Sequence, residues 1–95
     1  MENRNPAIGK IALGPALMFF HSIQEHRKRH HGRSPRKIEI HPAVMKDFRD
    51  QIRRDYPPRI QQEVENGSFF GVPILQNRHA QQPMLITHEG AVEFM

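Results

Sequence analysis

Apolar residues recur with helical spacing in the first third of the chain. An apolar stripe with i, i+3, i+4, i+7 spacing is formed by Ala16, Phe19, Phe20 and Ile23, and Leu17 and Met18 widen it. Gly14-Pro15 precedes this stripe, and proline suits the first turn of a helix because its missing N–H is not needed there. The spacing therefore predicts a helix that begins at Gly14-Pro15 and closes with Gly32 as its C-cap.

A second helix is expected from Pro42, because a second apolar stripe has its members four positions apart: Val44, Phe48 and Ile52. Tyr56-Pro57-Pro58 ends this helix. A shorter stripe follows: Ile60 and Val64. It stops at Asn66-Gly67, a favourable left-handed terminus. We interpret this stretch as a short helical turn, with an irregular loop as the alternative.

Two later segments have the character of strands. Ile38-Glu39-Ile40 alternates, which places both isoleucines on one face. From Phe69 to Leu75 the chain is apolar and favours β-structure. Gly71 and Pro73 interrupt this run, so we expect an imperfect strand at a sheet edge or with a bulge.

The chain closes with the pattern of a hairpin, because two strand-like segments, residues 84–87 and 91–94, flank a turn near Glu89-Gly90. Helices and strands together predict an α+β fold. We expect two main helices packed on a small mixed or antiparallel sheet, with a C-terminal β-hairpin.

Length and composition limit the number of domains. A chain of 95 residues forms one domain, since chains divide into separate cores only well beyond roughly 250 residues. Residues 1–7 have no periodicity and are predicted to be a flexible arm, and residues 8–95 to be a single α+β domain. With 37% hydrophobic residues the core is modest, which favours self-association or a protein partner.

No segment is predicted to cross a membrane. The longest apolar stretch, Ile11 to Phe20, is interrupted by Gly14-Pro15 and is shorter than the about 20 residues that span a bilayer. Positive charges follow this stretch, whereas they precede the apolar region of a signal peptide. The chain has no cysteine, which excludes disulfides, thiolate zinc sites and a cysteine nucleophile. We therefore expect a cytoplasmic protein.

Positive charge is concentrated in residues 26–37, called the basic segment below. It holds six of the 14 lysines and arginines and no acidic residue: Arg27, Lys28, Arg29, Arg33, Arg36 and Lys37. The net charge of +4 thus describes one patch on an otherwise slightly acidic chain, and this patch predicts an acidic partner. Nucleic acid is an alternative, since these side chains neutralise phosphates and release counterions. The segment lacks aromatic residues for base stacking.

Three histidines also lie in the basic segment. His26 and His30 are four positions apart on one helix face, a spacing that suits metal ligands. A zinc site needs three or four ligands, however, and flanking arginines oppose cation binding, so we expect neither a metal nor another cofactor. Protonation of His26, His30 and His31 near a pKa of ~6.5 would make the segment more positive. We therefore expect these histidines to modulate its charge.

The phenylalanines are predicted to be core or interface anchors, because each lies on an apolar stripe or strand. If exposed beside an edge strand, Phe69 and Phe70 would mark a docking surface, and they are the candidate protein interface. No catalytic residue can be named. Ser22 lies near His21, but no acidic residue or oxyanion turn completes a triad. No small-molecule substrate is indicated.

The order of elements also resembles a known family. The helix leads through Gly32-Arg33-Ser34-Pro35 to the strand with Ile38 and Ile40, and His41-Pro42 opens the next helix. Phe70-Gly71-Val72-Pro73-Ile74 and a final strand follow. Residues 20–95 thus resemble the late part of tailed-phage major capsid proteins, although the chain lacks the long helix and extended arm of a complete subunit. The resemblance implies a small phage-encoded structural or accessory protein, associated with the virion.

Three functions follow in order of preference. The first is a non-catalytic interaction or assembly module, which uses apolar surface for protein contacts or self-association and the basic segment for an acidic partner. The second is a small nucleic-acid-binding protein acting through the same segment. A metal-dependent hydrolase ranks third.

Overall fold

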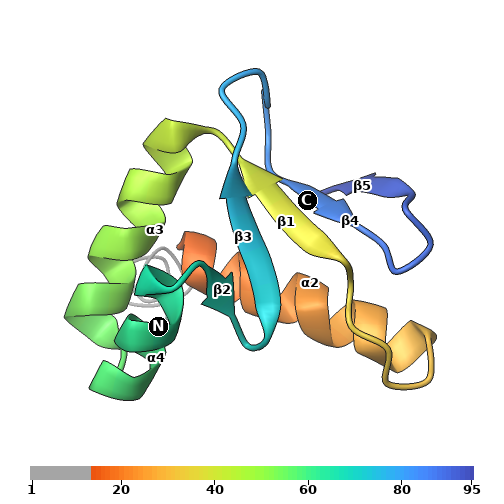
Figure 1. Ribbon diagram of the computed structural model, residues 1–95, viewed down its shortest axis with the longest axis horizontal. Helices are drawn as coiled ribbons and strands as arrows, with labels where there is room; N and C mark the ends of the chain where they lie inside the picture. Colours follow the sequence, from red (N-terminus) through yellow and green to blue (C-terminus); the bar gives the residue numbers. More distant parts are fainter. Residues whose placement is uncertain (1–13) are drawn as a thin grey trace, which may run out of the picture.

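The computed structural model describes residues 14–95, in which one strand lies between the first two helices and four strands follow the last helix (Figure 1). The helices are α2 (Pro15–Arg29), α3 (Pro42–Asp55) and α4 (Pro58–Glu65). The strands are β1 (Lys37–Ile40), β2 (Ser68–Phe69), β3 (Val72–Gln76), β4 (Met84–Ile86) and β5 (Val92–Phe94). The predicted α+β class is confirmed. The predicted arm at residues 1–7 lies outside the described residues.

Helix α2 begins as the sequence predicts and ends earlier. Pro15 occupies its first turn, and the Ala16 N–H donates to Gln51 Oε1 of α3 over 2.9 Å, which satisfies one free amide of the helix start. The helix ends at Arg29, and the predicted C-cap at Gly32 is wrong. His31 instead takes the left-handed conformation with φ of 55°, and the Gly32 N–H donates to the Arg27 carbonyl over 2.7 Å.

Helices α3 and α4 follow the predicted boundaries. His41 caps α3, because its Nδ1 accepts a hydrogen bond of 3.0 Å from the Ala43 N–H. The segment from Pro58 forms a true helix rather than the alternative loop, and it ends at Asn66. The two helices fill the connection between β1 and the next strands of the sheet.

The sheet is mixed, with the strand order β2-β3-β1-β4-β5. β1 lies at its centre and pairs parallel with β3, whereas the other neighbours are antiparallel. Residues that pair across these strands point to the same face, so Ile38 shares a face with Ile74 and Leu85. In Figure 1 the sheet lies in front of α2, and α3 and α4 stand beside it.

The apolar run from Phe69 to Leu75 is a tight hairpin instead of one imperfect strand. Phe70 and Gly71 both have positive φ, at 48° and 81°, and form the two-residue turn between β2 and β3. Such turns match the twist of the flanking strands. The predicted edge position is correct for β2, and the interruption at Gly71 is a turn where we expected a bulge or an edge.

The core lies between the inner face of the sheet and the helices. Three phenylalanine rings from α2, α3 and β2 meet there, with centroid distances of 5.1 Å for Phe19–Phe48 and 5.2 Å for Phe48–Phe69. Ile38, Ile40 and the rings are completely buried. Within residues 14–95, no helix combines the length and apolar character needed to cross a bilayer.

Candidate functional site

The basic segment covers the last turns of α2, the following loop and the start of β1. Two of its arginines hold hairpin turns. Arg27 Nη2 donates to the Phe70 carbonyl of the β2–β3 turn over 2.7 Å, and its Nε donates to Ser34 Oγ over 3.0 Å. Arg36 Nη2 donates to the His88 carbonyl in the β4–β5 turn over 3.2 Å. These two candidate binding residues therefore have structural contacts that an acidic partner would have to share.

The other four candidate residues differ in how far ion pairs within the domain occupy their charges. Lys37 forms an ion pair of 2.8 Å with Glu39, and Arg29 one of 3.5 Å with Glu93. Lys28 lies 3.9 Å from Glu25 but is 78% exposed, so this pair contributes little. Arg33 is exposed and has no ion pair among the contacts of residues 14–95. Lys28 and Arg33 are thus the most available charges.

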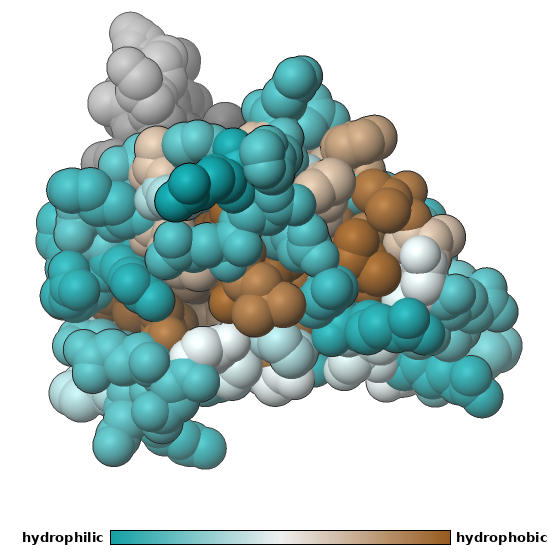
Figure 2. All heavy atoms as spheres, turned by 45° about the horizontal axis from the view of Figure 1, so that its top comes forward, coloured by the Kyte–Doolittle hydropathy of each residue, from teal (hydrophilic) through white to brown (hydrophobic). Residues whose placement is uncertain are grey.

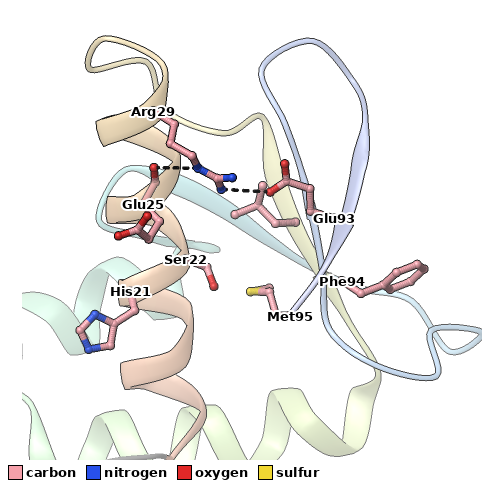
Figure 3. A pocket seen from close by; sticks show the side chains of 8 residues that line it. His21, Ser22, Glu25, Arg29, Glu93, Phe94 and Met95 are labelled. Carbon is pink, nitrogen blue, oxygen red and sulfur yellow. Dashed lines mark hydrogen bonds and ion pairs between the residues drawn. The ribbon is translucent and has the colours of Figure 1, made fainter.

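A shallow cavity of about 250 Å³ lies between α2, from His21 to Arg29, and the end of β5. Figure 3 shows Arg29 reaching across it from α2 toward Glu93, while its Nε also donates to the Glu25 carbonyl over 3.4 Å. Glu93 and Met95 point toward the helix in this view, and Phe94 points away from it. The alternation of β5 therefore turns Phe94 to the opposite face of the sheet.

Three histidines converge where α2 ends. His26 of α2 and His30, the residue after the last of α2, meet His88 of the β4–β5 turn, and one ring nitrogen from each lies within 4.8 Å of the others. The ring centroids are 4.4 Å apart for His26–His30 and 4.7 Å apart for His30–His88. His26 is completely buried, and its Nε2 lies 3.2 Å from His88 Nδ1. We call these three residues the histidine cluster.

The cluster changes the role expected of the histidines. Burial lowers the pKa of His30, and the neighbouring rings of His26 and His88 and the charge of Arg29 lower it further. His30 therefore gains charge at a lower pH than an exposed histidine, and the buried His26 adds little to the surface. His31 is exposed and remains a candidate for the predicted modulation of charge.

The candidate interface at Phe69 and Phe70 is not an exposed pair. Phe69 is completely buried against Phe48, and Phe70 is partly buried with its ring 4.9 Å from that of Phe20. Both belong to the core or its margin, which was the other interpretation of the phenylalanines. The hairpin turn explains the difference, since it folds β2 under α4 and α2.

The exposed apolar surface lies instead on the outer face of the sheet. Glu39 pairs with Leu75 and with Met84, and Met84 pairs with Phe94, so these side chains share one face. Val92 lies two residues before Phe94 and points the same way. Leu75 is 45% exposed, Val92 50% and Phe94 64%. Figure 2 shows hydrophobic side chains gathered toward the side of β4 and β5, with hydrophilic residues between them.

Sequence reasoning missed the histidine cluster and the apolar outer face of the sheet. His88 was not connected with His26 and His30, because it comes from a turn far away in the sequence. The sequence places Leu75, Val92 and Phe94 in strands but does not show whether they lie on the inner or the outer face of the sheet, since short strands do not reveal which face the helices cover.

Comparison of the chain with family models, with curated proteins and with solved structures found no match.

Proposed function

We propose that this domain is a non-catalytic interaction module that binds an acidic, amphipathic segment of another protein. The observation that carries the proposal is the outer sheet face. All three exposed large hydrophobic side chains of residues 14–95 lie there: Leu75, Val92 and Phe94. Exposed apolar side chains that share one face are typical of docking surfaces.

The end of the basic segment borders this face through Arg36 and Lys37, which supports an acidic partner. Lys37 pairs in register with Ile86, and Ile86 pairs with Val92, so Lys37 stands on the same face as the apolar side chains. Arg36 contacts the turn that joins β4 and β5. A partner with apolar residues flanked by carboxylates would therefore meet complementary groups. The resemblance to late parts of phage capsid proteins suggests assembly of a virion as the setting.

Nucleic acid remains the second candidate, because Lys28 and Arg33 are exposed and available for phosphates. A nucleic acid would bind the positive charges of the basic segment but would not contact the apolar outer face. The two candidates thus differ in whether Val92 and Phe94 contribute to binding.

The test measures binding by fluorescence anisotropy with three labelled probes. These are a helical peptide with leucines on one face and glutamates beside them, its counterpart with lysines for glutamates, and a DNA duplex. We expect the acidic peptide to bind best. Phe94→Ala should weaken it by about tenfold or more, as for a central interface residue. An Arg36→Gln, Lys37→Gln variant should raise Kd at low salt and reduce the dependence of Kd on salt concentration.

The matched control for Phe94→Ala is Met18→Ala, a partly buried apolar change on α2 that should leave peptide affinity unchanged. Equal binding of both peptides, or indifference to Phe94→Ala, would overturn the proposal. DNA binding that depends on Lys28 and Arg33 but not on Phe94 would support the second candidate instead.

A further inference from the structure

The histidine cluster has the composition and arrangement of a metal site. Its three members offer one imidazole nitrogen each, all within 4.8 Å of one another, and two of them are four positions apart at the end of α2. We propose that His26, His30 and His88 bind a divalent transition-metal ion, Zn²⁺ in the first place. This inference is independent of the partner proposed above, because it concerns other side chains and another ligand.

The nitrogen distances are close to those that zinc requires. A Zn–N bond of about 2.0–2.1 Å in a tetrahedral site places two ligand nitrogens about 3.3–3.4 Å apart. His26 Nε2 and His88 Nδ1 lie 3.2 Å apart. The third nitrogen, of His30, comes from the residue after the last of α2, where rotation of the side chain can close the remaining gap. One coordination position stays open for water.

The surroundings orient two of the three rings. His26 Nδ1 lies 2.9 Å from the Arg33 carbonyl, and a carbonyl only accepts, so Nδ1 carries the proton and Nε2 has the lone pair. This lone pair accepts from the His88 backbone N–H over 3.3 Å, and a bound ion would replace that hydrogen bond. His88 Nε2 lies 3.8 Å from a Glu89 carboxylate oxygen. When His88 Nδ1 binds the ion, its proton moves to Nε2 and faces Glu89. A carbonyl or carboxylate behind a ligating histidine is the usual arrangement.

Positive charge near the cluster is the argument against a cation, and its effect is limited. Arg29 is paired with Glu93 at 3.5 Å, and the guanidinium of Arg36 is directed to the His88 carbonyl. Glu89 contributes a negative charge on the other side of His88. The expectation of no metal site rested on two ligands of one helix. His88 supplies the third from a different element.

The donor set also selects the class of ion. Three neutral imidazoles suit Zn²⁺, Cu²⁺, Ni²⁺ or Co²⁺, whereas Mg²⁺ and Ca²⁺ prefer oxygen ligands. Imidazole binds a metal ion in its neutral form, so binding should weaken as the pH falls. A bound ion would link the end of α2 to the β4–β5 turn.

The experiment uses the full chain, first treated with a chelator and then titrated with ZnCl₂. We expect one zinc ion per chain and a rise in Tm on the order of 10 °C when free zinc exceeds Kd a hundredfold. MgCl₂ should have no effect. With Co²⁺, absorption between about 500 and 650 nm should report tetrahedral coordination. ¹⁵N NMR should assign the metal to Nε2 of His26 and Nδ1 of His88.

The variants are His30→Gln and His88→Gln, because neither residue is fully buried, and His26→Gln endangers folding. Both should abolish the zinc-dependent rise in Tm while the metal-free protein stays folded. His31→Gln is the matched control: it changes an adjacent, exposed histidine outside the cluster and should leave the rise intact. An equal rise in His30→Gln, or no rise in the unchanged protein at 100 µM zinc (roughly the free-ion excess needed for a micromolar site), would overturn the proposal.

Discussion

The two hairpins at opposite edges of the sheet are built in different ways. The β2–β3 hairpin sends Phe69 into the core, and its two-residue turn is held by Glu63, whose carboxylate accepts from Ser68 Oγ and from the Phe70 and Gly71 amides over 2.7–3.0 Å. The β4–β5 hairpin leaves Val92 and Phe94 exposed. Its turn is closed mainly by Thr87, whose Oγ1 accepts from the Ala91 N–H over 3.0 Å.

This contrast separates scaffold from surface. The first hairpin buries Phe69, Val72 and Ile74 and exposes Leu75, and its turn is held within the domain, so it contributes mainly to stability. The second buries Leu85, exposes Val92 and Phe94, and presents His88 to the end of α2. Substitutions at Phe69 and in its turn should therefore change the free energy of unfolding, and those at Val92, Phe94 and His88 should change binding.

The largest effect is expected from Phe69→Ala. Removal of a completely buried ring costs about 3–5 kcal/mol in the free energy of unfolding, because it leaves a cavity beside Phe48. Phe94→Ala, the equivalent change in the second hairpin, should stay within about 0.5 kcal/mol. Urea denaturation followed by circular dichroism measures both. Similar losses for the two variants would show that the hairpins do not differ as described.

A smaller loss is expected from Glu63→Ala. The change removes the acceptor of two turn amides and one hydroxyl, and stranded donors of this kind cost about 1–3 kcal/mol. Hydrogen exchange at the Phe70 and Gly71 amides should become faster in the variant. Glu65→Ala, an exposed change in the same helix, is the control and should leave both readouts unchanged.

The two arginines that reach the turns allow a finer comparison. Arg27→Gln loses a bond of 2.7 Å to the Phe70 carbonyl at a partly buried position and should destabilise the domain by about 1 kcal/mol. Arg36→Gln loses an exposed bond of 3.2 Å to the His88 carbonyl, and we expect only a few tenths of a kcal/mol, roughly the value of a surface contact. Thermal denaturation distinguishes the two. A larger loss for Arg36→Gln would reverse the assignment of scaffold and surface.

The smallest effect concerns Glu39, which lies between the two hairpins on β1. The hydrogen bond from Lys37, followed by that from Asn77, lowers the pKa of this carboxyl below its ordinary 4.5. A lowered folded-state pKa stabilises the protein above pH 4.5, and this contribution is lost as the pH falls through the folded-state value.

Glu39→Gln should therefore reduce the dependence of Tm on pH below about pH 4.5, a range set by the ordinary carboxyl pKa. Glu65→Gln serves as the control and should retain the full dependence. If Glu39→Gln leaves the slope of Tm against pH unchanged, the contacts with Lys37 and Asn77 do not stabilise the ionised carboxylate of Glu39.

Much of the fold could be predicted from local patterns. Helices α2, α3 and α4, strand β1 and the terminal hairpin follow from apolar spacing and from the prolines at 15, 42 and 58. The turn at Phe70-Gly71 could not, because an apolar run gives no sign that a phenylalanine will adopt a left-handed conformation. That conformation depends on Glu63 and Arg27, which come from two other elements.

The candidate site was predictable only in part. The charges of the basic segment are visible in the sequence, but their partners are not: Arg27 and Arg36 are engaged by turns of the distant hairpins. The spacing of His26 and His30 indicates two possible ligands, and only the packing of the β4–β5 turn against α2 brings His88 to them. Long-range contacts therefore decide which residues are free to bind and which are not.

The central position of β1 has a consequence for the growing chain. Ile38 pairs with Ile74 of β3 and with Leu85 of β4, and both partners are synthesised only after α3 and α4. The middle strand of the sheet thus has no partner while the first half of the chain leaves the ribosome. Truncation before Leu85 would leave one side of this apolar strand without a neighbour, and such unpaired edges recruit other chains. Correct assembly of this domain therefore depends on the completion of its last strands.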